Sequence, residues 1–304
     1  MNLSPLQREV RSWLEKRAAI LLAHNYQPGE IQDIADLTGD SLGLSRAASQ
    51  TSAKVIVFCG VHFMAETAAI LCPEKLVLLP RPDAGCFMAD TITPESLRQK
   101  KATLPGVPVV MYVNSSAAVK AESDICCTSA NAVRVVNSLP QTQVLMAPDR
   151  NLALYTQRHS SKKIYLWEGG CNIHDQLTAA EVLACKAAHP EASIIAHPEC
   201  RPEVLDLADA VRSTSGMLTY VRHDDHQEFI IGTEKGLLHT LKRENPQKHF
   251  YSPSERLLCQ DMKKISLADI VASLQNLAPV VSVPPDIRQR ALLAVNRMMA
   301  VPRD

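Results

Sequence analysis

The chain has 304 residues, and 46% of them are hydrophobic, which is typical of globular proteins with a sizeable core and excludes a disordered chain. Lysine and arginine total 32, as do aspartate and glutamate, so the chain lacks the positive excess with which proteins hold nucleic acids or anionic membranes. No apolar run approaches the roughly 18 residues that span a bilayer, and residues 1–17 carry charges where a signal peptide needs an apolar core. These features favour a cytoplasmic protein whose partners are small molecules, with no nucleic-acid or membrane partner.

The chain begins with a helix pattern at 3–18 and then repeats one arrangement three times. The units lie at roughly 18–83, 105–168 and 190–255, and each contains short apolar runs, rich in valine and isoleucine, that alternate with helix patterns. Such runs are typical of parallel strands covered by helices on both faces and joined by right-handed crossovers. A last helical segment at 266–299 lies outside the repeat, and we expect it to pack with the first helix on the first unit.

Polar residues recur in the three units at fixed spacing. His24, Tyr112 and His197 each follow or close an apolar run, and they lie 88 and 85 residues apart. An aspartate comes twelve residues after each of them and a hydroxyl residue five further on, giving the sets Asp36, Asp124 and Asp209, and Ser41, Ser129 and Thr214. A period of 85 to 88 residues implies three copies of one supersecondary unit, each long enough to be a small domain.

The sequence therefore predicts an α/β fold made of three similar αβα domains, each with a short parallel sheet, related by pseudo-threefold symmetry around a central site. The predicted domains are 1–86, onto which 260–304 pack back, 87–170 and 171–259. Ligands gather at the carboxyl ends of parallel strands. Since the polar landmarks occupy that position in every unit, we expect a threefold arrangement to bring them together.

Three of the nine cysteines recur in the same way. Cys86, Cys171 and Cys259 each follow the last apolar run of a unit, and they lie 85 and 88 residues apart. One thiol per domain is what a threefold axis needs to hold a single cofactor. Thiolates select zinc or an iron-sulfur cluster, and the chain has no C-x-x-C pair that would indicate a zinc ribbon or a ferredoxin.

A three-cysteine set has a chemical consequence if it holds a cubane cluster. One iron then lacks a protein ligand and can act as a Lewis acid on a substrate, which favours dehydration or condensation over simple electron transfer. Cys200 adjoins a polar landmark and is left unassigned. The other five are expected to be buried small hydrophobes, namely Cys59, Cys72, Cys126, Cys127 and Cys185.

The hydroxyl landmarks precede helix patterns, so each of them taken singly reads as an N-cap. Three helix N-termini that converge on one centre would also bind a phosphate or carboxylate. Proton donors, acceptors and orienting groups are available among His24, Tyr26, Tyr112, Asn114, His197 and Glu199. The aspartates of the repeat are expected to bond turn or helix-end backbone. Asp149 and Glu234 occupy equivalent positions at helix starts. Their side chains could either form ion pairs or contact a substrate, and the sequence favours neither role.

Several segments together resemble the quinolinate synthase family, the A proteins of bacterial and archaeal NAD biosynthesis. They include AHNYQ at 23–27, TSANAV at 128–133, HPEC at 197–200 and STSGM at 213–217, and the resemblance covers nearly the whole chain. It implies a 4Fe-4S cluster held by three cysteines with one open iron, and these ligands would be Cys86, Cys171 and Cys259.

The resemblance also implies a reaction and its residues. Iminosuccinate (iminoaspartate) would condense with dihydroxyacetone phosphate to give quinolinate, phosphate and two waters. Tyr26, His197 and Glu199 would transfer protons. Substrate would be bound by His24, Ser41, Tyr112, Asn114, Ser129, His174, His197, Glu199 and Thr214. Transient contact is implied with the aspartate oxidase or aspartate dehydrogenase that supplies the imine.

Two other functions fit a three-cysteine cluster. A redox or iron sensor would carry a labile cluster but would not need a glutamate, a tyrosine and three hydroxyl residues directed at the same cavity. A hydro-lyase in the manner of aconitase would use the open iron on one hydroxy acid and would need no phosphate. An assay with both proposed substrates separates the three hypotheses.

Overall fold

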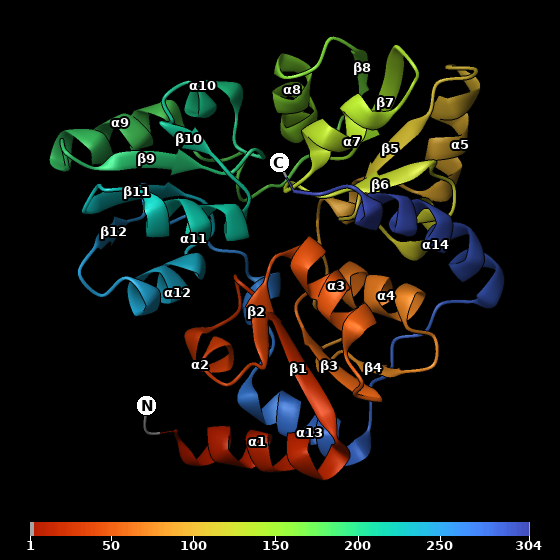
Figure 1. Cartoon of the computed structure of the whole chain (residues 1–304), viewed down its shortest axis with the longest axis vertical. Helices are drawn as coiled ribbons and strands as arrows, with labels where there is room; N and C mark the ends of the chain where they lie inside the picture. Colours follow the sequence, from red (N-terminus) through yellow and green to blue (C-terminus); the bar gives the residue numbers. More distant parts are fainter. Residues whose placement is uncertain (1–2, 304) are drawn as a thin grey trace.

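The computed structural model describes residues 3–303, which form three lobes around a common centre (Figure 1). Each lobe contains one four-stranded, all-parallel sheet with helices around it. The predicted α/β fold with three similar domains is therefore confirmed. Residues 1, 2 and 304, at the ends of the predicted first domain, lie outside the described residues, and the domain limits themselves stay predictions.

The first sheet has the strand order β2-β1-β3-β4. The preceding helix begins at a capping box in which Ser4 and Gln7 bond each other's backbone, with a proline at its first position. In chain order the elements are α1 (Pro5–Arg17), β1 (Ala19–His24), α2 (Gly29–Gln32), β2 (Leu37–Gly39), α3 (Ser41–Gln50), β3 (Val55–Cys59), α4 (His62–Leu71) and β4 (Leu76–Leu78).

The second and third sheets repeat this order as β6-β5-β7-β8 and β10-β9-β11-β12. The second domain contains η1 (Ala89–Thr91), α5 (Pro94–Ala102), β5 (Val109–Tyr112), α6 (Ala117–Lys120), β6 (Ile125–Cys127), α7 (Ala132–Ser138), β7 (Gln143–Ala147), α8 (Arg150–Arg158) and β8 (Lys163–Leu166). The third contains α9 (Ala179–Ala188), β9 (Ser193–Ala196), α10 (Pro202–Leu205), β10 (Ala210–Val211), α11 (Thr214–His223), β11 (Glu228–Gly232), α12 (Leu237–Glu244) and β12 (His249–Tyr251).

A carboxylate fixes the first strand of every domain. In each copy the aspartate accepts a hydrogen bond of 2.7 to 2.8 Å from the backbone N–H of a strand residue fifteen positions earlier. These aspartates are Asp36, Asp124 and Asp209. Their predicted structural role is confirmed, although the partner is a strand and not a turn or helix end.

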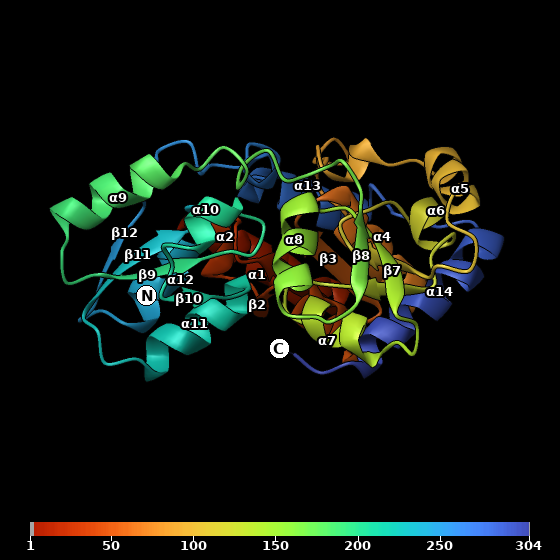
Figure 2. The same cartoon turned by 90° about the horizontal axis from the view of Figure 1, so that it is seen from above.

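The chain returns to the first domain and then leaves it again. After η2 (Asp261–Lys263), helix α13 (Leu267–Asn276) packs along α1, and Val280 forms an antiparallel bridge with Leu78 beside the first sheet. Helix α14 (Pro285–Ala300) then lies against α6 and β6 and also contacts α4 (Figures 1 and 2). Beyond the end of α14, Arg303 pairs with Asp40 through its two terminal guanidinium nitrogens.

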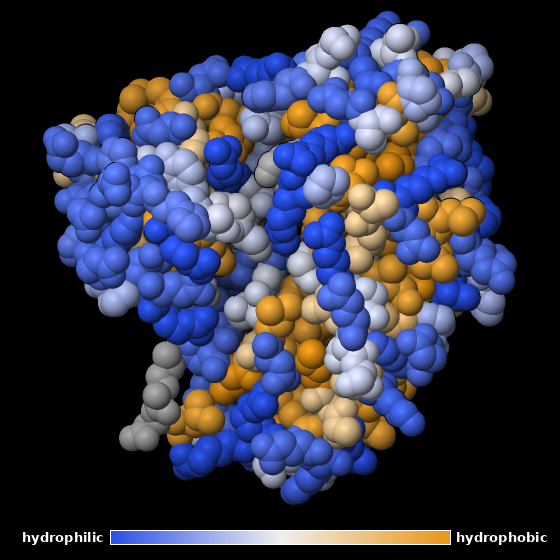
Figure 3. All heavy atoms as spheres, in the orientation of Figure 1, coloured by the Kyte–Doolittle hydropathy of each residue, from blue (hydrophilic) through white to orange (hydrophobic). Residues whose placement is uncertain are grey.

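Hydrophilic side chains cover most of the face shown in Figure 3, and apolar side chains gather over the first domain and toward α14. Leu293 of α14 is 63% exposed. Among residues 3–303, no helix combines the length and apolar character that a membrane crossing requires.

Candidate active site

The landmarks of the sequence repeat meet in one cavity at the centre of the three domains. His24 and Tyr112 end the middle strands β1 and β5, and His197 directly follows β9. The cavity has a volume of about 170 Å³, roughly ten times what one water needs, so it has room for small molecules. It is lined by every residue predicted for the site: His24, Tyr26, Ser41, Cys86, Tyr112, Asn114, Ser129, Cys171, His174, His197, Glu199, Thr214 and Cys259.

The hydroxyl landmarks are not the helix caps that their positions suggest. Asp40 caps α3 by accepting from the backbone N–H of Gly43, and Ser213 caps α11 in the same way. Ser41 and Thr214 are the first residues inside these helices, one position after the cap, and Ser129 lies two positions before Asn131, the cap residue of α7, so none of the three is the cap. The cap residues take the backbone donors, which leaves the hydroxyls of the next residues on the cavity wall.

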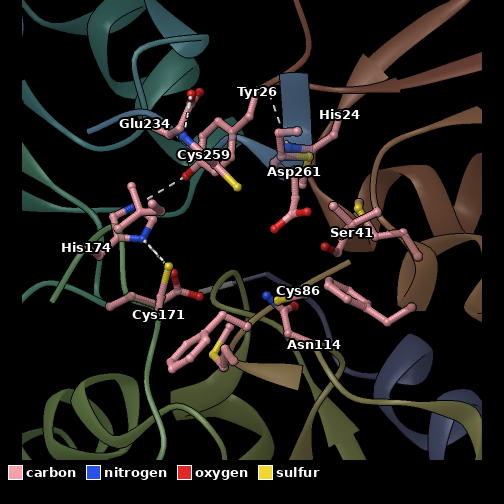
Figure 4. A pocket seen from close by; sticks show the side chains of 18 of the residues that line it. His24, Tyr26, Ser41, Cys86, Asn114, Cys171, His174, Glu234, Cys259 and Asp261 are labelled. Atoms are coloured by element: carbon pink, nitrogen blue, oxygen red, sulfur yellow. Dashed lines mark hydrogen bonds and ion pairs between the residues drawn. The ribbon is translucent and has the colours of Figure 1, made fainter. Parts of the chain in front are cut away.

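A continuous series of hydrogen bonds crosses the cavity. Tyr112 donates to Glu199 Oε1 at 2.6 Å, and Glu199 Oε2 lies 2.8 Å from His174 Nδ1. The other ring nitrogen of His174 lies 2.8 Å from Thr233 Oγ1, which is 2.6 Å from the hydroxyl of Tyr26. Figure 4 shows two members of this series, Tyr26 and His174, on the wall of the cavity. The series connects side chains of all three domains.

Glu199 is the charge around which this series is organised. Burial by itself would raise the pKa of Glu199, but His197, His174 and the Tyr112 hydroxyl together lower it to about 2. Burial raises the pKa of Tyr112 well above its ordinary value, and the charge of Glu199 adds to this effect; the pKa of Tyr26 is raised for the same two reasons. The carboxylate is therefore an ionised acceptor, and both phenols remain protonated donors near neutral pH.

The two landmark histidines are held neutral. Nδ1 of His24 accepts from the backbone N–H of Tyr26 at 3.2 Å, and Nδ1 of His197 accepts from the backbone N–H of Glu199 at 3.4 Å. Burial lowers the pKa of His24 to about 4 and that of His197 to about 3. Nε2 of His197 lies 3.2 Å from Ser129 Oγ. The same local geometry thus occurs at the end of the first strand in two domains.

Acid should weaken the fold through His24. Because the pKa of this histidine falls from 6.5 to about 4 on folding, the unfolded chain binds the extra proton first. The contribution of neutral His24 to the free energy of unfolding is fully present above pH 6.5. It falls by on the order of 3 kcal/mol as the pH falls toward about 4. Urea unfolding across this range should show a smaller pH dependence for His24→Asn, which keeps an acceptor but cannot titrate. Equal pH dependence in the two proteins would contradict the assignment.

The three repeated cysteines share a local geometry. The backbone N–H three residues further on donates to each sulfur, from Ala89 to Cys86, from His174 to Cys171 and from Met262 to Cys259. Figure 4 places the three sulfurs on different sides of one open space. Donors of this kind stabilise a thiolate. Cys72, in contrast, donates its own S–H to a helix carbonyl at 3.1 Å and does not line the cavity.

The donor set fits a cofactor that brings positive charge. Although each repeated cysteine is only half-buried, burial raises the pKa of Cys86 to about 12, and it also raises the pKa of Cys171 and Cys259. A bound metal offsets this cost by stabilising the thiolates. Among the described residues, ligand atoms of Cys171, His174 and Glu199 also lie within 4.8 Å of one another and could hold a single metal ion.

Two polar side chains of the cavity wall, those of Asn114 and Thr214, differ in whether the protein satisfies them. Asn114 Oδ1 is buried without a hydrogen-bond partner among the described residues, and an unpaired buried acceptor is costly unless a ligand donates to it. Thr214 Oγ1 accepts from Asn25 Nδ2 at 2.9 Å, which fixes it at the start of α11. Arg212 bonds the carbonyl of Val211 and does not line this cavity.

Sequence reasoning missed two residues that shape the site. Thr233, which directly follows β11, joins Tyr26 to His174, and its place at the end of an apolar run was the available signal. Asp40 lines the cavity and binds Arg303, whose guanidinium lowers the pKa of Asp40 against the effect of burial. No pattern in the sequence joins these two residues, which are 263 positions apart.

Comparison with known proteins gives the family. Residues 8–300 match the model of the family described as Quinolinate synthetase A protein. The chain is 57% identical over its whole length to the whole quinolinate synthase of Geobacter metallireducens. It is 54% identical to that of Methanosarcina barkeri over 99% of each chain. The chain therefore belongs to the quinolinate synthetase A protein family of enzymes.

Proposed function

We propose that this enzyme condenses iminosuccinate with dihydroxyacetone phosphate to give quinolinate, phosphate and two waters, as a step of NAD biosynthesis. The family and the cavity support this proposal, because both substrates are small anions and the wall offers polar groups of matching kind. Hydroxyls at the starts of α3 and α11 and their helix N-termini would bind the carboxylates and the phosphate.

Cys86, Cys171 and Cys259 would hold a 4Fe-4S cluster. The donor set supports this, since three thiols from three loops surround one space and each receives a backbone N–H. When bound, such a cluster supplies a Lewis acid at its open iron, which favours loss of hydroxide from a substrate. The protein's other residues would then orient the substrates and move protons.

Glu199 would act as the proton acceptor of the reaction. Its ionised carboxylate is in contact with Tyr112 and His174, and a buried base of this kind can remove a proton from a carbon next to a carbonyl or an imine. Tyr26 and Tyr112, which stay protonated, would donate to departing oxygens. Asn114 Oδ1 would accept from the substrate's N–H or O–H, which would satisfy a buried oxygen that has no partner among the described residues.

The observation that carries the proposal is the convergence of three thiols and an ionised glutamate on one cavity. The decisive experiment is an anaerobic assay in which iminosuccinate is generated in place and mixed with dihydroxyacetone phosphate. Quinolinate and one equivalent of phosphate should appear together. A protein with an intact cluster that forms neither product would reject the proposed reaction.

The same assay separates the two other hypotheses. A sensor would retain or lose its cluster with iron supply and convert neither substrate. A hydro-lyase would dehydrate a hydroxy acid in the absence of phosphate esters. Formation of quinolinate that depends on both substrates would exclude both.

Replacement of Thr233 with valine should lower kcat by about tenfold to a hundredfold, because Tyr26 and His174 both lose the hydroxyl that fixes them and small misplacements are costly in catalysis. Steady-state kinetics should show the loss mainly in kcat, and Thr233→Ser should restore most of it. Thr156→Val is the matched control, since this buried threonine bonds only a helix carbonyl. Equal activity of the valine and serine variants would remove the role of Thr233.

A further inference from the structure

The three cysteine loops are anchored at equivalent positions of the repeat. In each domain a residue shortly after the third strand donates its backbone N–H to the carbonyl two residues before the cysteine; His62 and Arg150 are the first residues of α4 and α8, and Lys235 lies two residues before α12. The bonds are His62 to Ala84 at 2.8 Å, Arg150 to Gly169 at 2.7 Å and Lys235 to Leu257 at 2.9 Å. This common anchor fixes where each loop begins.

Two of the domains add a second anchor through a buried carboxylate. Asp149 accepts from the backbone N–H of Cys171 at 2.7 Å and from that of Leu152 at 2.8 Å. Its side chain therefore spans the start of α8 and the cysteine itself. Asp149 is fully buried, and a Cβ at Gly170 would lie only 3.3 Å from its Oδ2, so the loop lies close against it.

Glu234 does the same in the third domain. It accepts from the backbone N–H of Cys259 at 3.2 Å and from that of Gly236 at 2.7 Å, and Lys263 lies 2.8 Å from its Oε1. Glu234 is also fully buried. Asp149 and Glu234 lie 37 residues after Tyr112 and His197, so they occupy the same position of the repeat.

We propose that Asp149 and Glu234 are positioning residues that hold the backbone of Cys171 and Cys259 in the geometry needed to ligate the cluster. The first domain has Val61 at the equivalent position, so among the described residues its loop has the common backbone anchor but no carboxylate at this position of the repeat. This inference rests on the proposed function for the identity of the cluster. The hydrogen bonds from the two carboxylates to the cysteine backbones are observed independently of that function.

The roles left open by the sequence, ion pairing and substrate contact, explain these residues less well. Asp149 has no cationic partner among the described residues, and all of its hydrogen bonds are to backbone N–H groups. Glu234 lines the cavity and pairs with Lys263, but both of its carboxylate oxygens also accept from backbone N–H groups, one of them that of Cys259. Residues that orient metal ligands typically contribute tenfold to a hundredfold to metal affinity.

The test compares Asp149→Asn and Glu234→Gln in the iron-loaded protein. Each amide keeps the shape of the side chain but turns an NH₂ group toward one of two backbone donors. The visible absorbance of the cluster should disappear about tenfold faster under a chelator in either variant. Asp124→Asn is the matched control, because Asp124 also accepts a backbone N–H, at 2.7 Å, but in the second sheet far along the chain from the cysteine.

A second measurement reports on the hydrogen bonds themselves. Amide hydrogen exchange should accelerate in the peptide containing Cys171 only for Asp149→Asn, and in the peptide containing Cys259 only for Glu234→Gln. Rates of cluster loss and amide exchange equal to wild type, or an equal acceleration in Asp124→Asn, would overturn the inference. Wild-type protein that carries no iron-sulfur absorbance would instead reject the proposed cofactor, and the exchange measurement would still decide whether the carboxylates hold the loops.

Discussion

Replacement of any one of Cys86, Cys171 and Cys259 with serine should remove most of the iron from the protein. The three thiols lie on different sides of one cavity. A cluster bound by all three would therefore lose one of its three protein ligands with each replacement. A serine hydroxyl is a poor ligand for iron in a sulfide cluster. Iron and sulfide content and visible absorbance after anaerobic purification should each fall by about tenfold or more.

The matched control is Cys72→Ser, which changes a buried thiol that bonds only a helix carbonyl. It should keep wild-type iron. A different pattern would identify a different centre. If Cys171→Ser alone loses metal while the other two variants keep it, the metal is a single ion held by Cys171, His174 and Glu199, whose ligand atoms lie within 4.8 Å of one another.

The fold could be predicted because its pattern is local and occurs three times. Short valine- and isoleucine-rich runs ending at His24, at Tyr112 and just before His197 are the middle strands of three parallel sheets, as expected. Because strand ends in parallel sheets point the same way, spacing alone indicated which side chains would gather. The path of α14 across α6 and β6 could not be predicted, since its sequence is compatible with packing on either neighbouring domain.

Contacts between domains were the part of the site that the sequence could not give. Thr233 acts by touching Tyr26 and His174, which come from two different stretches of chain, and no spacing rule describes such a contact. The helix caps failed for a different reason. Asp40 and Ser41 are both good capping residues, as are Ser213 and Thr214, and only the backbone angles decide which of the two is the cap.

Glu199→Gln should keep the cluster and lose most of the turnover. Glutamine has the same shape and can still accept from Tyr112 through its carbonyl oxygen, so the wall of the cavity should be preserved. Its amide nitrogen cannot accept a proton, and it places an NH₂ group where the carboxylate lies 2.8 Å from His174. Removal of a general base typically lowers the rate by about 10²- to 10⁴-fold, and the loss should appear in kcat more than in KM.

Glu228→Gln is the control, because Glu228 also pairs with a tyrosine hydroxyl, that of Tyr251 at 3.2 Å, but lies outside the cavity. It should leave kcat unchanged. Anaerobic kinetics are compared with iron content measured on the same samples, so that loss of turnover is not confused with loss of cluster. A Glu199→Gln enzyme with wild-type kcat would mean that the proton acceptor is another group, and the series from Tyr112 to Tyr26 would then serve only to fix the shape of the cavity.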